Sequence, residues 1–436
     1  MKCLVLYILL TLSFFVSSQL LANGWMWHGA FPWIYSHSDE TWLYLRTGKY
    51  GEFYRWSQLE GKWYELNDRT DTWEEHGNAE LDPSLWQIWE NNPAPYGGIL
   101  TLNKLKKAAL QSARRIDLSY QRVENLEPLT QLPKLRELYL QGNEIVKLSA
   151  LGSLRNLQIL DLSSNLIVDI SPLSTLNQLR ELNLDDNEIS DNNSTVFPLL
   201  GHLSNLEKLR IARNDISQTE GIDQLTHLEE LDLSRNSLKS AQDLIGLPSL
   251  RVLDLEGNLI TDFPSFPSSN QLNVLYLEDN FLSDINFITS LQELKEINLS
   301  DNRISNIGAL KLVERSLLWY VDLSYNALND LEGIDKLSNL RILSISNNSI
   351  SSLSPLSQLS ELRSLFMDNN DVVSLSPLGD TANLLGLYAA NNKITDPYGI
   401  IGLEKLMEAL LWGNEIDQQA QELLRLARPQ TAFGFD

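Results

Sequence analysis

Apolar and polar residues follow a frame that returns at nearly constant spacing over most of the chain. In Leu135-Arg-Glu-Leu-Tyr-Leu-Gln-Gly-Asn143, leucines occupy the first, fourth and sixth places and asparagine the ninth. The same frame recurs with its asparagine at Asn143, Asn165, Asn187, Asn214, Asn236, Asn258, Asn280, Asn302, Asn326, Asn348, Asn370, Asn392 and Asn414. Gln121 takes the asparagine place in one unit upstream, giving fourteen units. Such a repeat predicts a solenoid in which each unit contacts its neighbours.

Each unit predicts one short strand followed by a turn and a non-helical outer segment. In Leu138-Tyr139-Leu140 the leucines face one way and the tyrosine the other. The asparagine amide is expected to hydrogen-bond backbone groups of the turn that would otherwise be buried without partners. A 22-residue unit leaves too few residues for a full outer helix, so the outer side is predicted to hold extended chain and 3₁₀ turns.

Two units depart from the 22-residue step. The step from Asn187 to Asn214 is 27 residues, and the extra residues are predicted to enlarge an outer or rim loop. The step from Asn302 to Asn326 is 24 residues, and residues 310–315 are predicted to form a short helix. Insertions can carry binding residues, but tolerated loop growth is the commoner explanation.

The pattern LxxLxLxxNxIxxLxxLxxL over residues 113–416 resembles the leucine-rich repeat superfamily, specifically the 22-residue subtype of bacterial internalins and eukaryotic phosphatase-regulatory repeat proteins. The resemblance implies an α/β solenoid, a horseshoe with a parallel concave sheet, a 3₁₀ or extended convex side and helical caps. It also implies a protein-binding surface on the concave side. The ligand does not follow, because ligand choice lies in the variable positions.

The first 22 residues have one positive charge, an apolar run and small residues, which predicts a cleavable secretory signal. An uncleaved anchor is the alternative, but the run is short for a spanning helix and the flank beyond lacks positive charge. We therefore expect a secreted, periplasmic or cell-surface protein of bacterial origin with no stable membrane span. The only cysteine, Cys3, lies within this segment, so the mature chain is expected to have no disulfide.

Residues 23–66 differ in composition and predict a small aromatic-rich antiparallel β module. Its Gly-Lys-Trp-Tyr units loosely resemble aromatic cell-wall-binding repeats of exported bacterial proteins. The candidate glycan-binding residues are Trp33, Tyr35, Trp42 and Tyr44. The interpretation we favour is that a domain of this size without cysteines needs large aromatic side chains for its core.

Residues 67–99 predict a linker with one short helix, begun by Asp82 and Pro83. Residues 100–112 predict an N-terminal cap helix, with Thr101 as its capping residue. Residues 417–436 predict a C-terminal cap, whose helix starts at Asp417 and ends before Pro429. Both caps would keep water from the apolar ends of the solenoid.

The outward strand positions lie six, four and two places before each asparagine position. Across fourteen units they hold 14 acidic residues and 3 basic ones, a balance of −11 within a chain of net charge −23. This charge disfavours nucleic acid and predicts a basic protein ligand. An equally weighted alternative is that the acids keep an elongated exported protein soluble.

Aromatic residues on the same face concentrate in the last five units and predict a contact patch there. Some of them could instead lie beneath the C-terminal helix, most plausibly Trp412. The candidate partner-binding residues are Tyr139, Asp161, Asp232, Asp254, Tyr276, Glu278, Tyr320, Asp322, Phe366, Tyr388 and Trp412.

The sequence predicts no enzyme, metal site or cofactor. Its five histidines are scattered, and no nucleophile elbow, zinc-protease motif, phosphate loop or CxxC pair occurs. We therefore expect an exported protein that binds a protein partner through its acidic concave face. The alternative is a cell-surface or glycan attachment protein that uses the aromatic module, with the repeats as a spacer. A third interpretation, an intracellular phosphatase regulator, requires that the signal is not cleaved.

Overall fold

The structure is a computed structural model that describes residues 85–191, 196–313 and 316–435 with their side chains. For the strands between residues 25 and 75 and for residues 83–84 it describes the backbone. The predicted signal, residues 1–22, and the predicted helix cap Asp82 lie outside the described residues. The chain divides into two compact units, Met1–Leu138 and Tyr139–Asp436.

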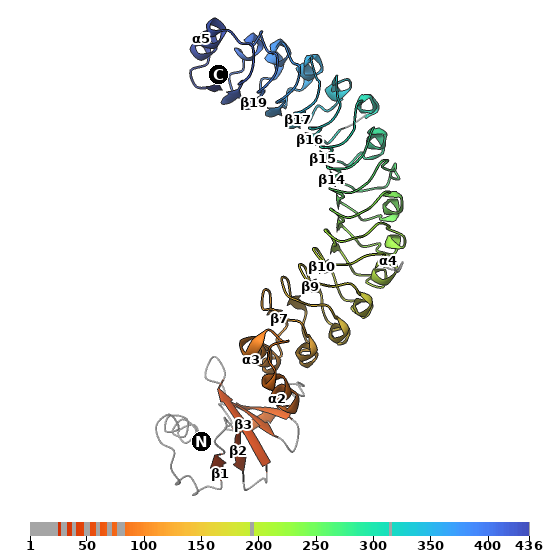
Figure 1. Cartoon of the computed structure of the whole chain (residues 1–436), viewed down its shortest axis with the longest axis vertical. Helices are drawn as coiled ribbons and strands as arrows, with labels where there is room; N and C mark the ends of the chain where they lie inside the picture. The colour runs from red at the N-terminus through yellow and green to blue at the C-terminus, as the bar shows by residue number, and fades with distance from the viewer. Residues whose placement is uncertain are drawn as a thin grey trace. The chain divides into compact units, whose positions relative to one another are not determined.

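The first unit begins with a six-stranded antiparallel sheet in simple sequence order (Figure 1). Its strands are β1 (Trp25–Trp27), β2 (Trp33–Ser36), β3 (Thr41–Thr47), β4 (Phe53–Ser57), β5 (Lys62–Asn67) and β6 (Thr72–Glu75). The predicted meander is confirmed, but it continues past the predicted boundary at residue 66. Residues 72–75, which were predicted as part of the linker, instead form strand β6. This strand pairs with β5 and satisfies the backbone hydrogen-bonding groups along the outer edge of β5.

Two helices follow, α2 (Pro83–Asn91) and α3 (Gly98–Leu110). Helix α3 starts earlier than predicted, and the predicted role of Thr101 as its cap is wrong. The N-cap is Gly97, whose left-handed backbone (φ 77°) is costly for residues with a side chain. Thr101 lies inside the helix, buried, and its Oγ1 donates to the carbonyl of Gly97 at 2.9 Å.

The repeats form one 15-stranded sheet whose strands are three residues long and follow one another in sequence order. The strands are β7 (Arg115–Asp117), β8 (Glu137–Tyr139), β9 (Ile159–Asp161), β10 (Glu181–Asn183), β11 (Lys208–Arg210), β12 (Glu230–Asp232), β13 (Val252–Asp254), β14 (Val274–Tyr276), β15 (Glu296–Asn298), β16 (Tyr320–Asp322), β17 (Ile342–Ser344), β18 (Ser364–Phe366), β19 (Gly386–Tyr388), β20 (Glu408–Leu410) and β21 (Ala432–Gly434). The parallel sheet confirms the predicted fold class. Strand β21 has no counterpart in the predicted units.

Short 3₁₀ helices occupy the outer side of most repeats, as predicted (Figure 1). They are η2 (Glu127–Gln131), η3 (Ser149–Ser153), η4 (Ser171–Thr175), η5 (Ile222–Gln224), η6 (Gln242–Gly246), η7 (Asn286–Ser290), η8 (Gly308–Leu312), η9 (Ile334–Lys336), η10 (Ser354–Gln358), η11 (Ser376–Asp380) and η12 (Tyr398–Ile400). The 27-residue unit instead has α4 (Val196–Leu200). The helix predicted over 310–315 is replaced by η8, which starts earlier; residues 314–315 lie outside the described part.

The asparagines form a hydrogen-bonded ladder through the second unit, and this confirms their predicted role. Asn258 is 3% exposed, and its Nδ2 donates to the carbonyls of Leu233 and Leu255, both at 3.0 Å. Its Oδ1 accepts the N–H of Leu238 at 3.0 Å. Each asparagine therefore joins its own turn to the preceding repeat, which fixes the register of the strands.

The C-terminal end is closed by α5 (Gln418–Ala427) and β21. Asp417 caps the helix as predicted, because its Oδ1 accepts the N–H of Ala420 at 2.7 Å. Leu424 of this helix is fully buried. Strand β21 then pairs in parallel with β20. Within the part of the chain that the structure describes, no helix is long and apolar enough to cross a membrane.

Candidate functional site

The candidate site is the solvent-facing side of the sheet in the second unit, which we call the concave face. It comprises the residues six, four and two places before each asparagine, together with Gly434 of β21. Strand alternation produces it: in β13 the central Leu253 is buried, whereas Val252 and Asp254 on either side reach solvent. All eleven predicted partner-binding residues have positions on this face.

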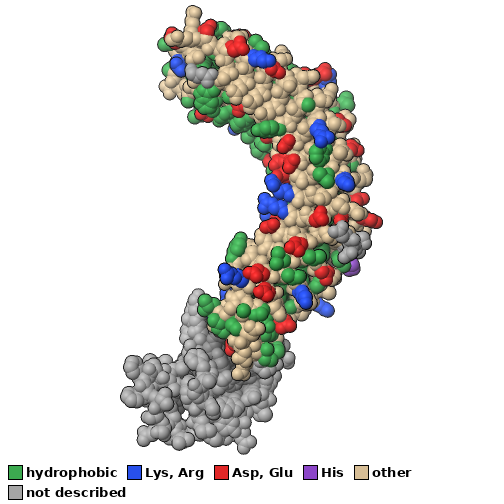
Figure 2. Space-filling view, in the orientation of Figure 1, with side chains coloured by type: hydrophobic (Ala, Val, Ile, Leu, Met, Phe, Trp, Pro, Cys, Tyr) green, Lys and Arg blue, Asp and Glu red, His purple; other side chains and the backbone are tan. Residues whose placement is uncertain are grey.

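Six carboxylates form what we call the acidic section of this face. They are Asp161, Asp185, Asp232, Asp254, Glu278 and Asp322, which lie on strands β9 to β16 or two residues after one of them. Basic side chains at concave positions of the second unit are limited to Lys208 and Arg210 on β11. Lys208 is already paired with Glu230 at 2.8 Å. Figure 2 shows acidic and basic side chains near the middle of the concave side.

Three carboxyl groups of the acidic section have raised pKa values, because they are partly buried and lie near other negative charges. Partial burial raises the pKa of Asp254 to about 6, and the charges of Asp232 and Glu256 add to the effect. Burial likewise raises the pKa of Glu278 to about 7, with Glu256 and Asp254 as the nearest charged contributors. Burial also raises the pKa of Asp185 to about 6. A cationic ligand would offset the repulsion between these neighbouring carboxylates.

Several of these aspartates also have a local structural role. Asp161 Oδ1 accepts the N–H of Ser163 at 2.9 Å and its hydroxyl at 2.6 Å. The pairs Asp232–Ser234 and Asp322–Ser324 repeat this turn. An Asp-x-Ser pattern at these positions is therefore a turn signal in the sequence as well as a source of charge.

Two tyrosines lie among the acids. Burial raises the pKa of Tyr320 to about 12, and the charges of Asp322 and Glu278 contribute. Burial also raises the pKa of Tyr276, with Glu296 and Asp254 nearby. Both phenols therefore remain protonated at neutral pH and can donate hydrogen bonds to a ligand.

The C-terminal part of the face is different, and we call Phe366, Tyr388, Leu410 and Trp412 the aromatic section. The rings of Phe366 and Tyr388 stack with centroids 4.5 Å apart and planes at 5°. The hydroxyl of Tyr388 donates to Glu408 Oε2 at 3.0 Å. Figure 2 shows hydrophobic side chains gathered on the concave side toward this end.

Glycines let the aromatic rings lie close to the sheet. A Cβ on Gly386 would be 3.1 Å from Tyr388 Cε2. A Cβ on Gly434 would be 2.7 Å from the ring of Trp412. The suggestion that Trp412 lies beneath the C-terminal helix is therefore wrong: its ring lies against β21, and the side chain is 45% exposed. The cause is the added strand, which extends the sheet beside β20.

The predicted glycan-binding residues lie on the N-terminal sheet. The register of the N-terminal sheet pairs Trp33 with Tyr44 and Tyr35 with Trp42, so the predicted glycan-binding residues occupy neighbouring positions. Their side chains lie outside the described part.

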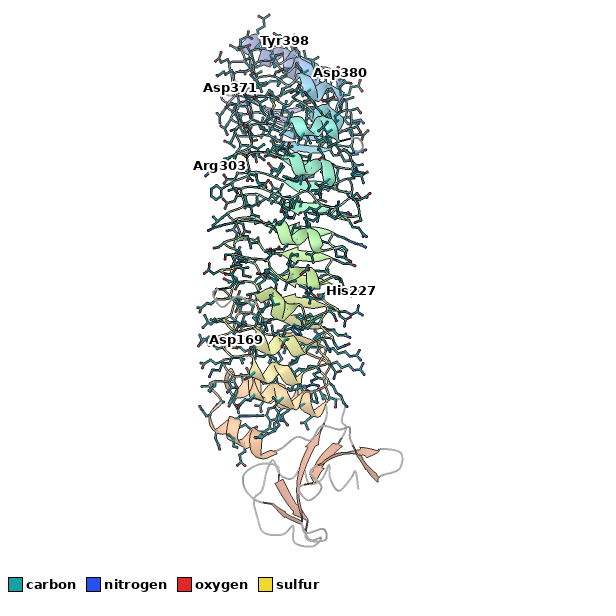
Figure 3. All side chains as sticks on the ribbon, turned by 90° about the vertical axis from the view of Figure 1, so that its right-hand side faces the viewer. Asp169, His227, Arg303, Asp371, Asp380 and Tyr398 are labelled. Carbon is teal, nitrogen blue, oxygen red and sulfur yellow. The ribbon has the colours of Figure 1, made fainter. Side chains whose placement is uncertain are left out.

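The other faces of the repeats carry charged residues, some of them in ion pairs, such as Lys393 with Asp371 at 2.5 Å. Asp169, Arg303 and Asp371 line one lateral edge of the second unit, and His227 lies at the other (Figure 3). Among the described residues, no group of His, Cys, Asp and Glu is arranged to hold a metal ion.

Comparisons with known proteins agree with this geometry. Family models of leucine-rich repeats match residues 133–189, 226–268, 290–313 and 338–380. Among curated proteins, no sequence relative matches the chain.

Solved structures match over most of the chain. It is similar to an internalin from Listeria monocytogenes, with 26% identity, a TM-score of 0.64, and coverage of 73% of this chain and 93% of the internalin. It is similar to a leucine-rich repeat protein of Leptospira interrogans, with 27% identity, a TM-score of 0.61, and coverage of 76% and 98%. An Arabidopsis receptor kinase ectodomain in complex with a peptide hormone shares the fold at 22% identity and TM-score 0.55, with coverage of 71% and 56%. The chain is a leucine-rich repeat protein with an internalin-like fold.

Proposed function

We propose that this protein is exported and binds a protein partner through the concave face of its second unit. Leucine-rich repeat proteins are generally binding scaffolds, and the Arabidopsis receptor of the same fold binds a peptide hormone. The signal-like composition of residues 1–22 supports export. The mechanism is recognition by shape and charge, with no catalytic step.

The observation that carries the proposal is the aromatic section. Trp412 is 45% exposed, and Phe366 and Tyr388, whose rings stack on each other, are partly exposed on the same face. Aromatic side chains held in fixed positions on an accessible face are favoured anchors for protein partners. The neighbouring acidic section favours a partner with a basic surface, since like charge would be repelled.

Affinity capture from the native envelope with the mature protein, followed by titration of the captured protein, tests the proposal. Phe366→Ala should weaken binding by at least about tenfold. The matched control is Tyr398→Ala, which removes a 47% exposed aromatic side chain from η12 on the outer side (Figure 3). Equal binding by the wild type and Phe366→Ala would contradict the proposal.

A second candidate function is glycan attachment through residues 23–66, with the repeats as a spacer. The register supports it by aligning Trp33, Tyr44, Trp56 and Trp63 in one row across β2, β3, β4 and β5. Sugar rings stack on such aromatic rows. Glycan binding that survives deletion of residues 100–436, but not of 23–66, would support this function over the first.

A further inference from the structure

We infer that the concave face binds one extended segment of the partner, in which basic residues lie about three to six positions from an aromatic or large apolar residue. This inference rests on the proposed function and names the chemistry of its ligand. It follows from the two sections of the face, their order along the sheet and the distance between them.

The aromatic section is built as a rigid anchor site. The stack of Phe366 on Tyr388 fixes both rings, and the bond from Tyr388 to Glu408 fixes the hydroxyl. Gly386 beneath the ring of Tyr388 leaves room for it to lie along the sheet. Rings that are already ordered lose little conformational entropy when an apolar side chain packs on them. This favours an aromatic or large apolar side chain as the anchor.

The adjacent carboxylates supply the charge complementarity. From β12 to the C-terminal end, every charged residue at a concave position is acidic. Arg235 pairs with Glu256 at 2.5 Å, but the ion pairs found among the described residues include none with Asp254, Glu278 or Asp322. A ligand segment that carries lysine or arginine would supply positive charge beside these carboxylates.

The spacing follows from the strand order. Asp322 on β16 is two strands from Phe366 on β18, and Glu278, after β14, is four strands away. At about 4.8 Å per strand these separations are about 10 and 19 Å. An extended chain advances about 3.3 Å per residue, so basic residues about three to six positions from the anchor would reach both carboxylates.

A second copy of this chain is a poor occupant of the face. Each copy has a net charge of −23 and the same acidic section, so two copies would repel each other. A partner segment that presents positive charge avoids this repulsion.

The experiment measures fluorescence anisotropy of labelled synthetic peptides with the mature full chain. One peptide has a pair of arginines about four residues from a phenylalanine, and a second has the same composition with about twelve residues between them. Both are made in the two possible orders. The short-spaced peptide in one order should bind at least about tenfold more tightly than its long-spaced counterpart. Equal binding at both spacings in both orders would overturn the inference.

Single-residue variants test whether the aromatic section binds the phenylalanine and the acidic section binds the arginines. Phe366→Ala should remove the spacing preference, and Glu278→Gln should weaken the short-spaced peptide while leaving a phenylalanine-only peptide unchanged. The matched controls are Tyr398→Ala and Asp380→Asn, which change exposed residues on the outer side (Figure 3). Sedimentation at the same concentrations reports self-association, and a dimer that depends on Phe366 would overturn the inference in favour of a second copy.

The two proposals fail differently. If Phe366→Ala weakens a captured partner protein but no peptide shows a spacing preference, the concave face binds protein and the segment inference is wrong. If the captured protein binds wild type and Phe366→Ala equally, the proposed function itself is wrong.

Discussion

Replacing one ladder asparagine by alanine tests how the repeats are held in register. Asn258→Ala removes an amide that donates to the carbonyls of Leu233 and Leu255, both at 3.0 Å. It also removes the oxygen that accepts the N–H of Leu238 at 3.0 Å. The side chain is 3% exposed, so water does not readily replace these partners.

The three hydrogen bonds lost on Asn258→Ala differ in how much each loss lowers the free energy of unfolding. The carbonyl of Leu233 keeps a bond from Asn236, and that of Leu255 keeps one from Asn280. The N–H of Leu238 has no other partner among the described residues and would be buried without an acceptor. An orphaned buried donor costs about 1–3 kcal/mol, and the two weakened carbonyls with the vacated volume add about 1 kcal/mol. The expected loss in the free energy of unfolding is about 2–4 kcal/mol.

Urea denaturation followed by far-ultraviolet circular dichroism measures this loss, and hydrogen exchange at the Leu238 amide localises it. Exchange is needed because a solenoid need not unfold in a single cooperative step. Thr261→Ala, at an exposed position of the same repeat, is the control and should change stability by less than about 0.5 kcal/mol. An Asn258→Ala loss no larger than this control would refute the reasoning.

Three further predictions concern single positions. Because the pKa of Glu278 is raised to about 7 and that of Asp254 to about 6, the folded state binds more protons, so stability should fall as pH rises from about 4 to 7. Glu278→Gln should reduce this fall by roughly 1 kcal/mol after allowance for solvent screening, as measured by thermal melts across that range. Tyr325→Asn should stabilise the chain by about 0.5–1 kcal/mol in urea titrations, because residue 325 has φ 53° and asparagine tolerates this conformation better. Asp417→Ala should remove the N-cap of α5 and destabilise the C-terminal end by about 1 kcal/mol, seen as faster exchange of the Ala420 amide.

Most of the repeat architecture could be predicted because each unit carries the same local information. The alternation around Leu138 indicated the strand, and Asn143 indicated the turn. The residue before the asparagine has a left-handed backbone in repeat after repeat, a feature that the spacing of leucines and asparagines does not predict. Glycine at 142, 257 and 413 was a readable signal for it, although Arg213 and Tyr325 at the same place obscured it.

The wrong predictions concern segments outside the repeats, where the structure depends on contacts with other segments. Thr101 looks like a helix cap, but Gly97 starts the helix earlier because its backbone takes a conformation that side chains disfavour. Ala432-Phe-Gly434 has no strand pattern of its own. It becomes β21 because β20 offers an unpaired edge, and the position of Trp412 depends on that pairing.

The hydrogen bonds at the turn after each strand show which property of the acidic side chains the fold requires. Asp161 and Asp322 accept a serine N–H at this turn. In β15, Asn298 makes the same bond to the N–H of Ser300 at 3.0 Å without carrying a charge. The turn therefore requires an acceptor and not a carboxylate. Glu278 is not one of these turn acceptors, so the turns do not require its negative charge. The acids of the concave face are consequently better explained by solubility or by a basic ligand than by folding, and the peptide titration with Glu278→Gln distinguishes these two explanations.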